Sequence, residues 1–173
     1  MYFYKKKTST NILSKMHPDK NIFMTEAIRL AAENLKTAKG GPFGAVVVKD
    51  GKIVGRGENS VTSSNDPTAH AEVNAIRDAC KNLNTFQLDD CEIYTSCEPC
   101  PMCLGAIYWA RPKKIYYACS KQDAANAGFD DSFIYEEINI SLAERSIPAL
   151  QMMQSDALEV FKNWIAMENK IEY

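Results

Sequence analysis

Residues 91–118, CEIYTSCEPCPMCLGAIYWARPKKIYYA, contain the strongest fold signal in the sequence. Residues 91–95 and 113–118 each contain aromatic and β-branched side chains, which favour strands. Between them, Pro101 stands where a helix through Ala110 would begin, and proline is well tolerated in a first helical turn. A strand, a helix and a strand in so short a stretch predict a βαβ unit with parallel strands and a right-handed crossover.

The sequence on either side adds further helices and strands. Asp50-Gly51 is typical of a two-residue hairpin turn, because both residues tolerate positive φ. Asp66-Pro67 is typical of a helix start, and Asp156 with Glu159 has the spacing of a capping box. The other expected elements are a helix over 21–39, strands over 45–49 and 52–54, a loop over 57–67, helices from 67 to about 81 and over 131–137, a weak strand over 149–153 and a closing helix over 156–168. We therefore predict a single α/β domain in which helices cover a mostly five-stranded sheet.

Composition and charge narrow the class of protein. The chain has 173 residues, 46% of them hydrophobic and 24% charged, so one packed domain is expected. Residues 1–20 contain five Lys and one Asp, which leaves residues 21–173 with a net charge of −6 within a total of −2. We expect residues 1–20 to be a basic, solvated N-terminal extension and residues 21–173 to be the single domain. The acidic body argues against nucleic-acid binding, which requires clustered cations.

The N-terminal residues, the apolar runs and the cysteines indicate the cellular compartment of the protein. Lys5-Lys6-Lys7 is followed by polar residues, and no apolar run approaches the roughly 18 residues that span a bilayer, so we expect a cytoplasmic protein without membrane attachment. The chain has six cysteines, at positions 80, 91, 97, 100, 103 and 119. Free thiols or metal ligands are favoured over disulfides, which belong to oxidising compartments. The cysteines at 80, 91 and 119 stand alone and are expected to be small buried side chains.

Two short segments carry the chemistry: Pro67-Thr-Ala-His70-Ala-Glu72 and Pro99-Cys100-Pro-Met-Cys103. Cys100 and Cys103 lie three residues apart at an expected helix start, so they share a face, and the positive helix end favours thiolates. With His70 they match a zinc site that has three protein ligands and leaves a fourth position for water. We therefore expect one zinc ion per chain.

Glu72 is expected to carry protons and not to bind the metal. A two-residue step turns about 200° around a helix, but at the first turn Glu72 can curl toward a metal that His70 binds. Zinc lowers the pKa of bound water, and a nearby carboxylate can then pass a proton to the leaving group. The pattern H-x-E followed by P-C-x-x-C is the signature of zinc-dependent nucleobase deaminases.

Other interpretations of these residues exist. A C-x-x-C pair also occurs in redox dithiols and in packed cores, and His70 also suits an ordinary capping turn. A structural zinc site would need a fourth protein ligand, Cys97 or His17. Cys97-x-x-Cys100 satisfies the required spacing, although Cys97 is expected to be packed at the end of a strand.

The resemblance extends beyond these motifs. From about Ile22 to Tyr173 the chain resembles the bacterial guanine deaminases of the cytidine deaminase superfamily. The segments that carry the resemblance are GGPFGAV (40–46), Glu58-Asn59, NDPTAHAE (65–72), YTSCEPCPMCLGAIYWARP (94–112), AGFDDSFIY (127–135) and Glu172-Tyr173. The segments around His70 and Cys100 are shared by many relatives. The Asp130-Asp131 segment and the terminal tyrosine are more particular to members that act on guanine.

The resemblance implies a cytidine deaminase-like fold, α/β with three layers, α/β/α, around a five-stranded mixed sheet. The same resemblance implies a homodimer that swaps its C-terminal segment, and hydrolysis of guanine to xanthine and ammonia. It also implies zinc on His70, Cys100 and Cys103, with Glu72 as the proton carrier. The implied base pocket consists of Phe43, Asn59, Ala71, Trp109, Asp131 and Tyr173. Asp131 suits guanine, because a carboxylate accepts from a ring N–H and an adjacent amine, either to orient the base or to shuttle a proton. Without the resemblance, Phe43 and Trp109 would be core residues, Asn59 a turn residue and Asp131 a helix cap.

The expected function is therefore zinc-dependent deamination of guanine, with a free purine base as the partner and neither nucleic acid nor membrane. Alternatives are a related amine, such as guanosine, an aminotriazine or cytosine, and adenosine in transfer RNA. The net charge of −2 over residues 156–173 argues against transfer RNA. A non-catalytic zinc module is a further alternative, which predicts a metal site with four protein ligands.

Overall fold

The structure is a computed structural model, and it describes residues 18–172. The elements in chain order are α1 (Pro18–Thr37), β1 (Gly44–Lys49), β2 (Lys52–Glu58), α2 (Val61–Ser64), α3 (Ala71–Leu83), β3 (Cys91–Cys97), α4 (Pro101–Ala110), β4 (Lys114–Cys119), α5 (Lys121–Asn126), α6 (Ser132–Asn139) and α7 (Gln154–Ala166). The expected basic extension over residues 1–20 lies almost wholly outside the described residues, as do His17 and Tyr173. None of the helices in the described part of the chain combines the length and hydropathy needed to span a membrane.

The sheet is mixed, with strand order β2-β1-β3-β4. β1 is antiparallel to both β2 and β3, and β3 is parallel to β4. The hairpin turn has φ of 49° at Asp50 and 72° at Gly51, as the turn sequence predicts. The predicted hairpin and the β3-α4-β4 unit are both confirmed.

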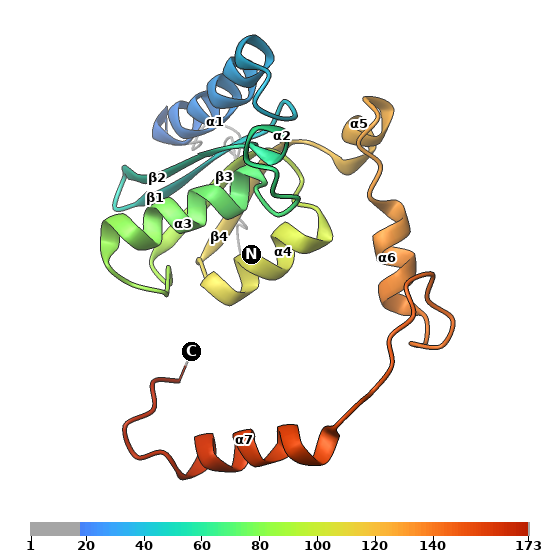
Figure 1. Cartoon of the computed structure of the whole chain (residues 1–173). Coiled ribbons are helices and arrows are strands. Elements are labelled where there is room, and N and C mark those ends of the chain that lie inside the picture. The colour runs from blue at the N-terminus through green and yellow to red at the C-terminus, as the bar shows by residue number, and fades with distance from the viewer. Residues whose placement is uncertain (1–17, 173) are drawn as a thin grey trace, which may run out of the picture.

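Helices cover the two faces of the sheet, α1 on one face and α3 with α4 on the other (Figure 1). On the α1 side, Phe23 and Leu30 pack with Val46, Val48 and Tyr94. On the other side, buried residues of α3 and α4 pack against the sheet in a cluster with Ala45, Val47, Leu88, Cys91 and Ile93. The predicted three-layer arrangement is therefore confirmed.

Glycines on β2 bring α3 unusually close to the sheet. A Cβ at Gly57 would collide with the carbonyl oxygen of Ala71, and one at Gly55 would lie 2.5 Å from that of Ala75. Only glycine permits this backbone approach. The start of α3, which carries the predicted site residues, is therefore held directly against the end of β2.

The prediction of a fifth strand is wrong for the described chain, which has four strands. Residues 149–153 have no regular secondary structure, and Leu150 and Met152 are 86% and 79% exposed. A strand needs a neighbour to pair its backbone groups, and this segment lies away from the outer edge of β4 (Figure 1).

Two expected helix caps differ from the structure, and one helix was not expected. Asp66 does not cap α3: its carboxylate accepts from the backbone N–H and hydroxyl of Thr68, so the helix begins only after His70. Glu159 forms an ion pair with Lys162 and not a capping box. The unpredicted helix α5 begins with a capping box between Ser120 and Asp123, a signal that the sequence contains.

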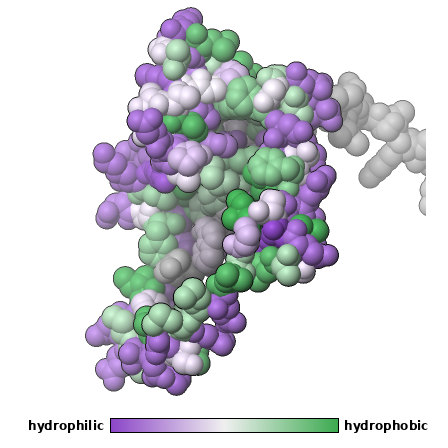
Figure 2. Space-filling view, turned by 45° about the vertical axis from the view of Figure 1, so that its right-hand side comes forward, coloured by the Kyte–Doolittle hydropathy of each residue, from purple (hydrophilic) through white to green (hydrophobic). Residues whose placement is uncertain are grey.

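Residues 141–172 form a C-terminal arm that leaves the body of the protein (Figure 1). Its helix α7 exposes large apolar side chains, including Phe161 at 65%, Trp164 at 40% and Ile165 at 70%. Figure 2 shows hydrophobic surface on this lowest part of the molecule and on the body above it. Apolar surface of this extent is typical of a contact site.

Candidate metal centre and active site

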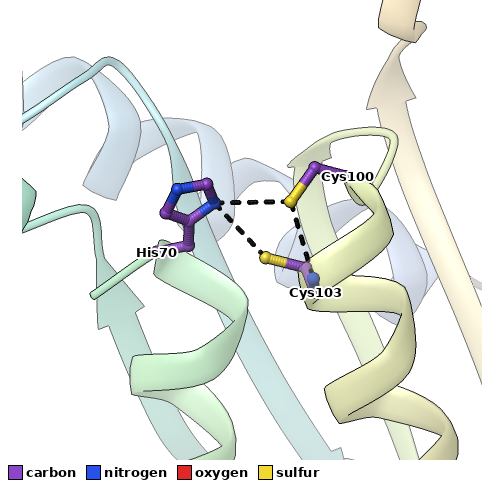
Figure 3. Close-up of side chains that lie close together, drawn as sticks. All are labelled: His70, Cys100 and Cys103. Carbon is purple, nitrogen blue, oxygen red and sulfur yellow. Dashed lines mark hydrogen bonds between the residues drawn. The ribbon is translucent and has the colours of Figure 1, made fainter. Parts of the chain in front are cut away.

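Two helix N-termini bring His70, Cys100 and Cys103 together (Figure 3). His70 is the N-cap of α3 and Cys100 the N-cap of α4, and Cys103 lies in the first turn of α4. The Nδ1 atom of His70 lies 3.5 Å from the Sγ atom of each cysteine. All three candidate ligand atoms lie within 4.8 Å of one another, and they form the metal-binding cluster found among the described residues.

The spacing of these atoms fits zinc. Zn–S bonds of about 2.3 Å and Zn–N bonds of about 2.0 Å at a tetrahedral angle place the ligand atoms about 3.5 Å apart. The observed Nδ1–Sγ distances are both 3.5 Å. Two thiols and one imidazole are also the donor types that zinc prefers in catalytic sites. The arrangement therefore fits a zinc ion with three protein ligands.

Interactions between Cys100 and Cys103 favour a thiolate at Cys100. Hydrogen bonds from the Cys103 thiol, and then from His70, lower the pKa of Cys100 to about 4. The backbone N–H of Cys103 also donates to the Cys100 sulfur. The pKa of Cys103 is correspondingly raised, because its thiol donates to Cys100. The thiolate form of Cys100 is thus favoured, and binding of a cation would release the proton of the Cys103 thiol.

Cys97 lies outside this cluster. It is the last residue of β3, it is 6% exposed, and its thiol donates to the carbonyl oxygen of Ser120 at 3.4 Å. The prediction that it is packed at a strand end is confirmed. Cys91 is buried as expected, whereas Cys119 is exposed because it ends the edge strand β4. All six cysteines are free thiols.

Glu72 lies beside the cluster in the first turn of α3. Its side chain is 5% exposed, and the Thr95 hydroxyl donates to its Oε1 atom at 2.8 Å. Burial raises the pKa of Glu72 above that of a free glutamate. A carboxylate that exchanges protons near neutral pH needs such a shift. His70 and Glu72 thus occupy the N-cap and the first turn of α3, the helix start at which the sequence predicts them.

A cavity of about 370 Å³ opens onto these residues. Its lining includes His70, Glu72 and Cys100, together with Phe43, Asn59 and Asp131. These last three residues come from separate segments: Phe43 directly precedes β1, Asn59 directly follows β2, and Asp131 is the N-cap of α6. Small-molecule sites have volumes of roughly 300–1,000 Å³, so the cavity is large enough for a compact ligand.

The polar groups of the cavity are held in fixed positions. The Asn59 side-chain oxygen accepts from the N–H groups of Gly41 and Val61, both at 3.2 Å, which leaves its NH₂ group as a donor for a ligand. The Phe43 ring meets Phe129 edge-on, with centroids 4.9 Å apart. These contacts orient an amide donor and an aromatic face along the same cavity.

Asp131 and its neighbour Asp130 have different surroundings. Asp130 accepts from the N–H of Ser132 at 2.9 Å, whereas Asp131 makes no side-chain cap bond although it occupies the cap position of α6. Both residues line the cavity. Burial raises the pKa of Asp131. The capping interpretation therefore does not account for the Asp131 side chain.

Two expected pocket residues are placed elsewhere. Ala71 is fully buried in the core between α3 and the sheet, and its side chain is absent from the described lining. Trp109 is 63% exposed and lines a separate hollow with Phe86. Six residues separate it from Cys103, which along α4 is about 9 Å, so the helix carries Trp109 away from the metal cluster. The expectation for Tyr173 falls outside the described residues.

The sequence argument missed several lining residues, among them Glu98, Lys121, Phe129 and Phe133. Lys121 begins the unpredicted helix α5, and the Ser120–Asp123 spacing was the available signal for that helix. Phe129 and Phe133 flank the Asp130-Asp131 segment. Their place in the cavity depends on how α5 and α6 fold back, which no local pattern indicates.

Comparison with known families gives a clear match. Residues 17–119 match the family model of the cytidine and deoxycytidylate deaminase zinc-binding region, a span that contains the whole metal cluster and Glu72. The chain belongs to this deaminase family. The zinc-binding region and the geometry of the cluster agree that the cofactor of this deaminase is zinc.

Individual relatives resemble this deaminase to different extents. It is 60% identical to the guanine deaminase of Bacillus subtilis (strain 168) over 151 residues, which is 87% of this chain and 97% of the relative. It is 41% identical to a tRNA-specific adenosine deaminase of Aquifex aeolicus over 57% of this chain and 65% of the relative. The X-ray structure of Bacillus subtilis guanine deaminase aligns with a TM-score of 0.86 at 59% identity, covering 88% of this chain and 98% of that one. The structure of a guanine deaminase from Nitrosomonas europaea aligns with a TM-score of 0.61 at 33% identity, over 66% and 65% of the two chains.

Proposed function

We propose that this protein hydrolyses guanine to xanthine and ammonia. The observation that carries the proposal is the extent of similarity to the Bacillus subtilis guanine deaminase, which covers 87% of this chain and 97% of that protein. The Aquifex aeolicus adenosine deaminase matches only 57% of the chain. The location that goes with this chemistry and with free thiols is the cytoplasm. Residues 21–173 act as the single deaminase domain.

In this proposal His70, Cys100 and Cys103 hold the zinc ion. Zinc bound there supplies the Lewis acidity that activates water for attack on the carbon bearing the amine. Glu72 takes a proton from the attacking water and delivers it to the leaving amine. The hydrogen bond from Thr95 to Glu72 Oε1 holds the carboxylate in a fixed orientation for this transfer.

The base is held by the polar and aromatic groups of the cavity. Phe43 provides a face for stacking, and the Asn59 NH₂ group donates to an acceptor on the base. Guanine presents a ring N–H beside its exocyclic amine, and the Asp131 carboxylate accepts from both. Asp131 thereby selects guanine over bases without this pair of donors. Tyr173 completes the pocket in this proposal, and Ala71 and Trp109 are not assigned to it.

A second candidate is deamination of adenosine in transfer RNA, because several tRNA-specific adenosine deaminases match part of the chain. An enzyme that acts on RNA needs cations along the path of the phosphate backbone. Residues 21–173 carry a net charge of −6, and residues 156–173 a net charge of −2. The free base is therefore the substrate that the charge distribution favours.

The deciding experiment measures ammonia release by the zinc-loaded protein from guanine, guanosine, an aminotriazine, adenine and cytosine, and from transfer RNA. We expect rapid turnover of guanine and at least about 100-fold lower kcat/KM for adenine, cytosine and transfer RNA adenosine, because a site built to pair with two donors penalises ligands that lack them. Guanosine carries the same two donors, so its rate relative to guanine measures whether the site admits a ribose. Turnover of cytosine or of transfer RNA with no turnover of guanine would reject the proposal and, with it, the role of Asp131.

The active form is proposed to be a homodimer in which the C-terminal arms are exchanged. Two features of the described chain support this. The arm exposes a row of apolar side chains, including Phe161 and Ile165, and the outer edge of β4 has no strand partner within residues 18–172. Residues 149–153 of the partner's arm would supply the fifth strand on this edge, because an open edge pairs readily with an extended segment.

Replacing both Phe161 and Ile165 with aspartate is expected to convert the dimer into a monomer. The two residues lie one helical turn apart on α7, at 65% and 70% exposure, so the charges would fall in the centre of the proposed contact. Light scattering coupled to gel filtration measures the mass. Asn163→Asp, which adds a charge on the same helix, is the control and should remain dimeric. A native protein that is monomeric at micromolar concentration would contradict the proposal.

A further inference from the structure

Lys121 is a positively charged residue in a cavity lined mainly by apolar and acidic side chains. Among the described lining residues it is the one lysine or arginine, and it shares the lining with the carboxylates of Glu72, Glu98, Asp130 and Asp131. A single cation among four carboxylates influences which of them stays ionised in a partly buried site. The roles proposed so far for the cavity do not use this residue.

The backbone of Lys121 is anchored to the loop that precedes the metal cluster. Its N–H donates to the Glu98 side chain at 3.1 Å, and the Glu98 N–H in turn donates to the carbonyl oxygen of Cys119 at 2.8 Å. The Ser120–Asp123 capping box fixes the start of α5 at the same point. The backbone of Lys121 is therefore fixed to Glu98, which stands two residues before Cys100 in the sequence.

The side chain of Lys121 extends from this anchor to α6. Its Nζ atom lies 4.7 Å from the centroid of the Tyr135 ring, a distance typical of a cation–π contact. Tyr135 is four residues after Asp131, so the two lie on the same side of α6. The ammonium group is thus held on the side of the helix that presents Asp131 to the cavity.

The electrostatics agree with this placement. Burial raises the pKa of Asp131 and the nearby Cys100 raises it further, whereas Lys121 acts in the opposite direction. The ammonium group therefore favours the charged carboxylate, which is the form that accepts two hydrogen bonds. Asp131 makes no cap bond of its own that would hold it in place.

We propose that Lys121 is a positioning residue: through its contact with Tyr135 it holds the start of α6, and with it the Asp131 carboxylate, against the cavity. It joins the metal-binding loop to α6 and so sets the distance between the reacting centre and the group that recognises the base. This inference rests on the proposed guanine deaminase function. It predicts that Lys121 affects binding of the base and acts through Asp131.

The test uses the zinc-loaded, full-length protein with Lys121→Met, Lys121→Arg and Asp131→Asn, and with the double variant that combines Lys121→Met with Asp131→Asn. Lys121→Met should raise KM for guanine about tenfold with little change in kcat, the loss typical of one charged interaction. Lys121→Arg should restore most of the affinity. In the Asp131→Asn background, Lys121→Met should have no further effect, because the residue through which it acts is gone.

Lys114→Met is the matched control. Lys114 also lies over a tyrosine ring, with its Nζ atom 5.1 Å from the centroid of Tyr116, but it lines a different hollow of the surface. The control loses the same charge and the same type of contact, and its KM should stay at the native value. Thermal unfolding and dimer mass are measured for every variant to exclude a structural cause.

Binding of guanine to the Glu72→Gln protein, in which the proposed proton carrier is removed, is measured by calorimetry and gives a readout that does not depend on turnover. The four variants are repeated in this background. The inference is overturned if Lys121→Met leaves KM and guanine affinity unchanged, if it lowers kcat alone, or if it has the same effect with and without Asp131. A native protein that binds guanine without deaminating it would reject the proposed function. In that case the guanine affinities of the four variants still support or overturn the role of Lys121.

Discussion

Replacing Glu72 with glutamine is expected to lower kcat for guanine by about 10²–10⁴-fold while the zinc content stays unchanged. Glutamine has nearly the same shape, and its carbonyl oxygen can accept the hydrogen bond that Thr95 donates to Glu72 at 2.8 Å. It cannot take a proton from water or return one to an amine. The substitution therefore removes the proposed proton transfer and leaves the packing around a side chain that is 5% exposed.

The measurements are steady-state ammonia release and zinc analysis of the purified variant. Glu92→Gln is the control, because Glu92 is a carboxylate of β3 that accepts a hydrogen bond from Tyr94 at 2.9 Å and does not line the cavity. It should retain native activity. If Glu72→Gln keeps most of its activity, Glu72 is not the proton carrier. If the variant loses zinc, Glu72 contributes to metal binding and the three-ligand description is wrong.

The second large effect is expected from Cys103→Ser, which should release zinc and abolish turnover. The Cys103 side chain is 1% exposed, and its Sγ atom lies 3.5 Å from the Nδ1 atom of His70. Its sulfur is therefore a buried member of the metal cluster. Serine does not ionise at neutral pH, and zinc binds thiolates far better than hydroxyls. Loss of a group that only supports a ligand already weakens metal binding by about 10–100-fold, and loss of a ligand itself should exceed this.

Zinc content after dialysis and ammonia release measure this effect, and Cys97→Ser is the matched control. Cys97 is buried nearby at the end of β3, but its thiol donates to the carbonyl oxygen of Ser120 and not to the cluster. Cys97→Ser should keep its zinc and its activity. Equal loss of zinc from both variants would mean a site with four protein ligands, which has no open position for water and favours a structural role.

Local sequence patterns predicted the central βαβ unit, the hairpin at Asp50-Gly51 and the start of α4 at Pro101. They also identified the metal cluster and Glu72, because these residues occupy helix starts, where a few neighbouring residues determine the backbone. The two predicted helix caps at Asp66 and Glu159 were wrong, and in both cases the side chain has a closer partner. Asp66 bonded to Thr68 instead of capping α3, and Glu159 paired with Lys162.

The tertiary structure decided what the cavity contains. His70 and Cys100 are 30 residues apart, and they meet because α3 and α4 cover the same face of the sheet with their N-termini side by side. Phe43, Asn59 and Asp131 reach the cavity from three different elements, whereas α4 carries Trp109 away from it.

Local sequence patterns thus predicted the chemistry proposed for this protein: the ligand types, the candidate proton carrier Glu72 and the elements that hold them. The packing of the elements places the aromatic and polar groups along the cavity, puts Lys121 in the same lining as Asp131 and leaves the apolar face of the C-terminal arm exposed. The difference lies in the range of the interactions. Helix starts and turns depend on hydrogen bonds between residues a few positions apart, whereas a cavity depends on the packing of elements distant in the chain, which no local pattern encodes.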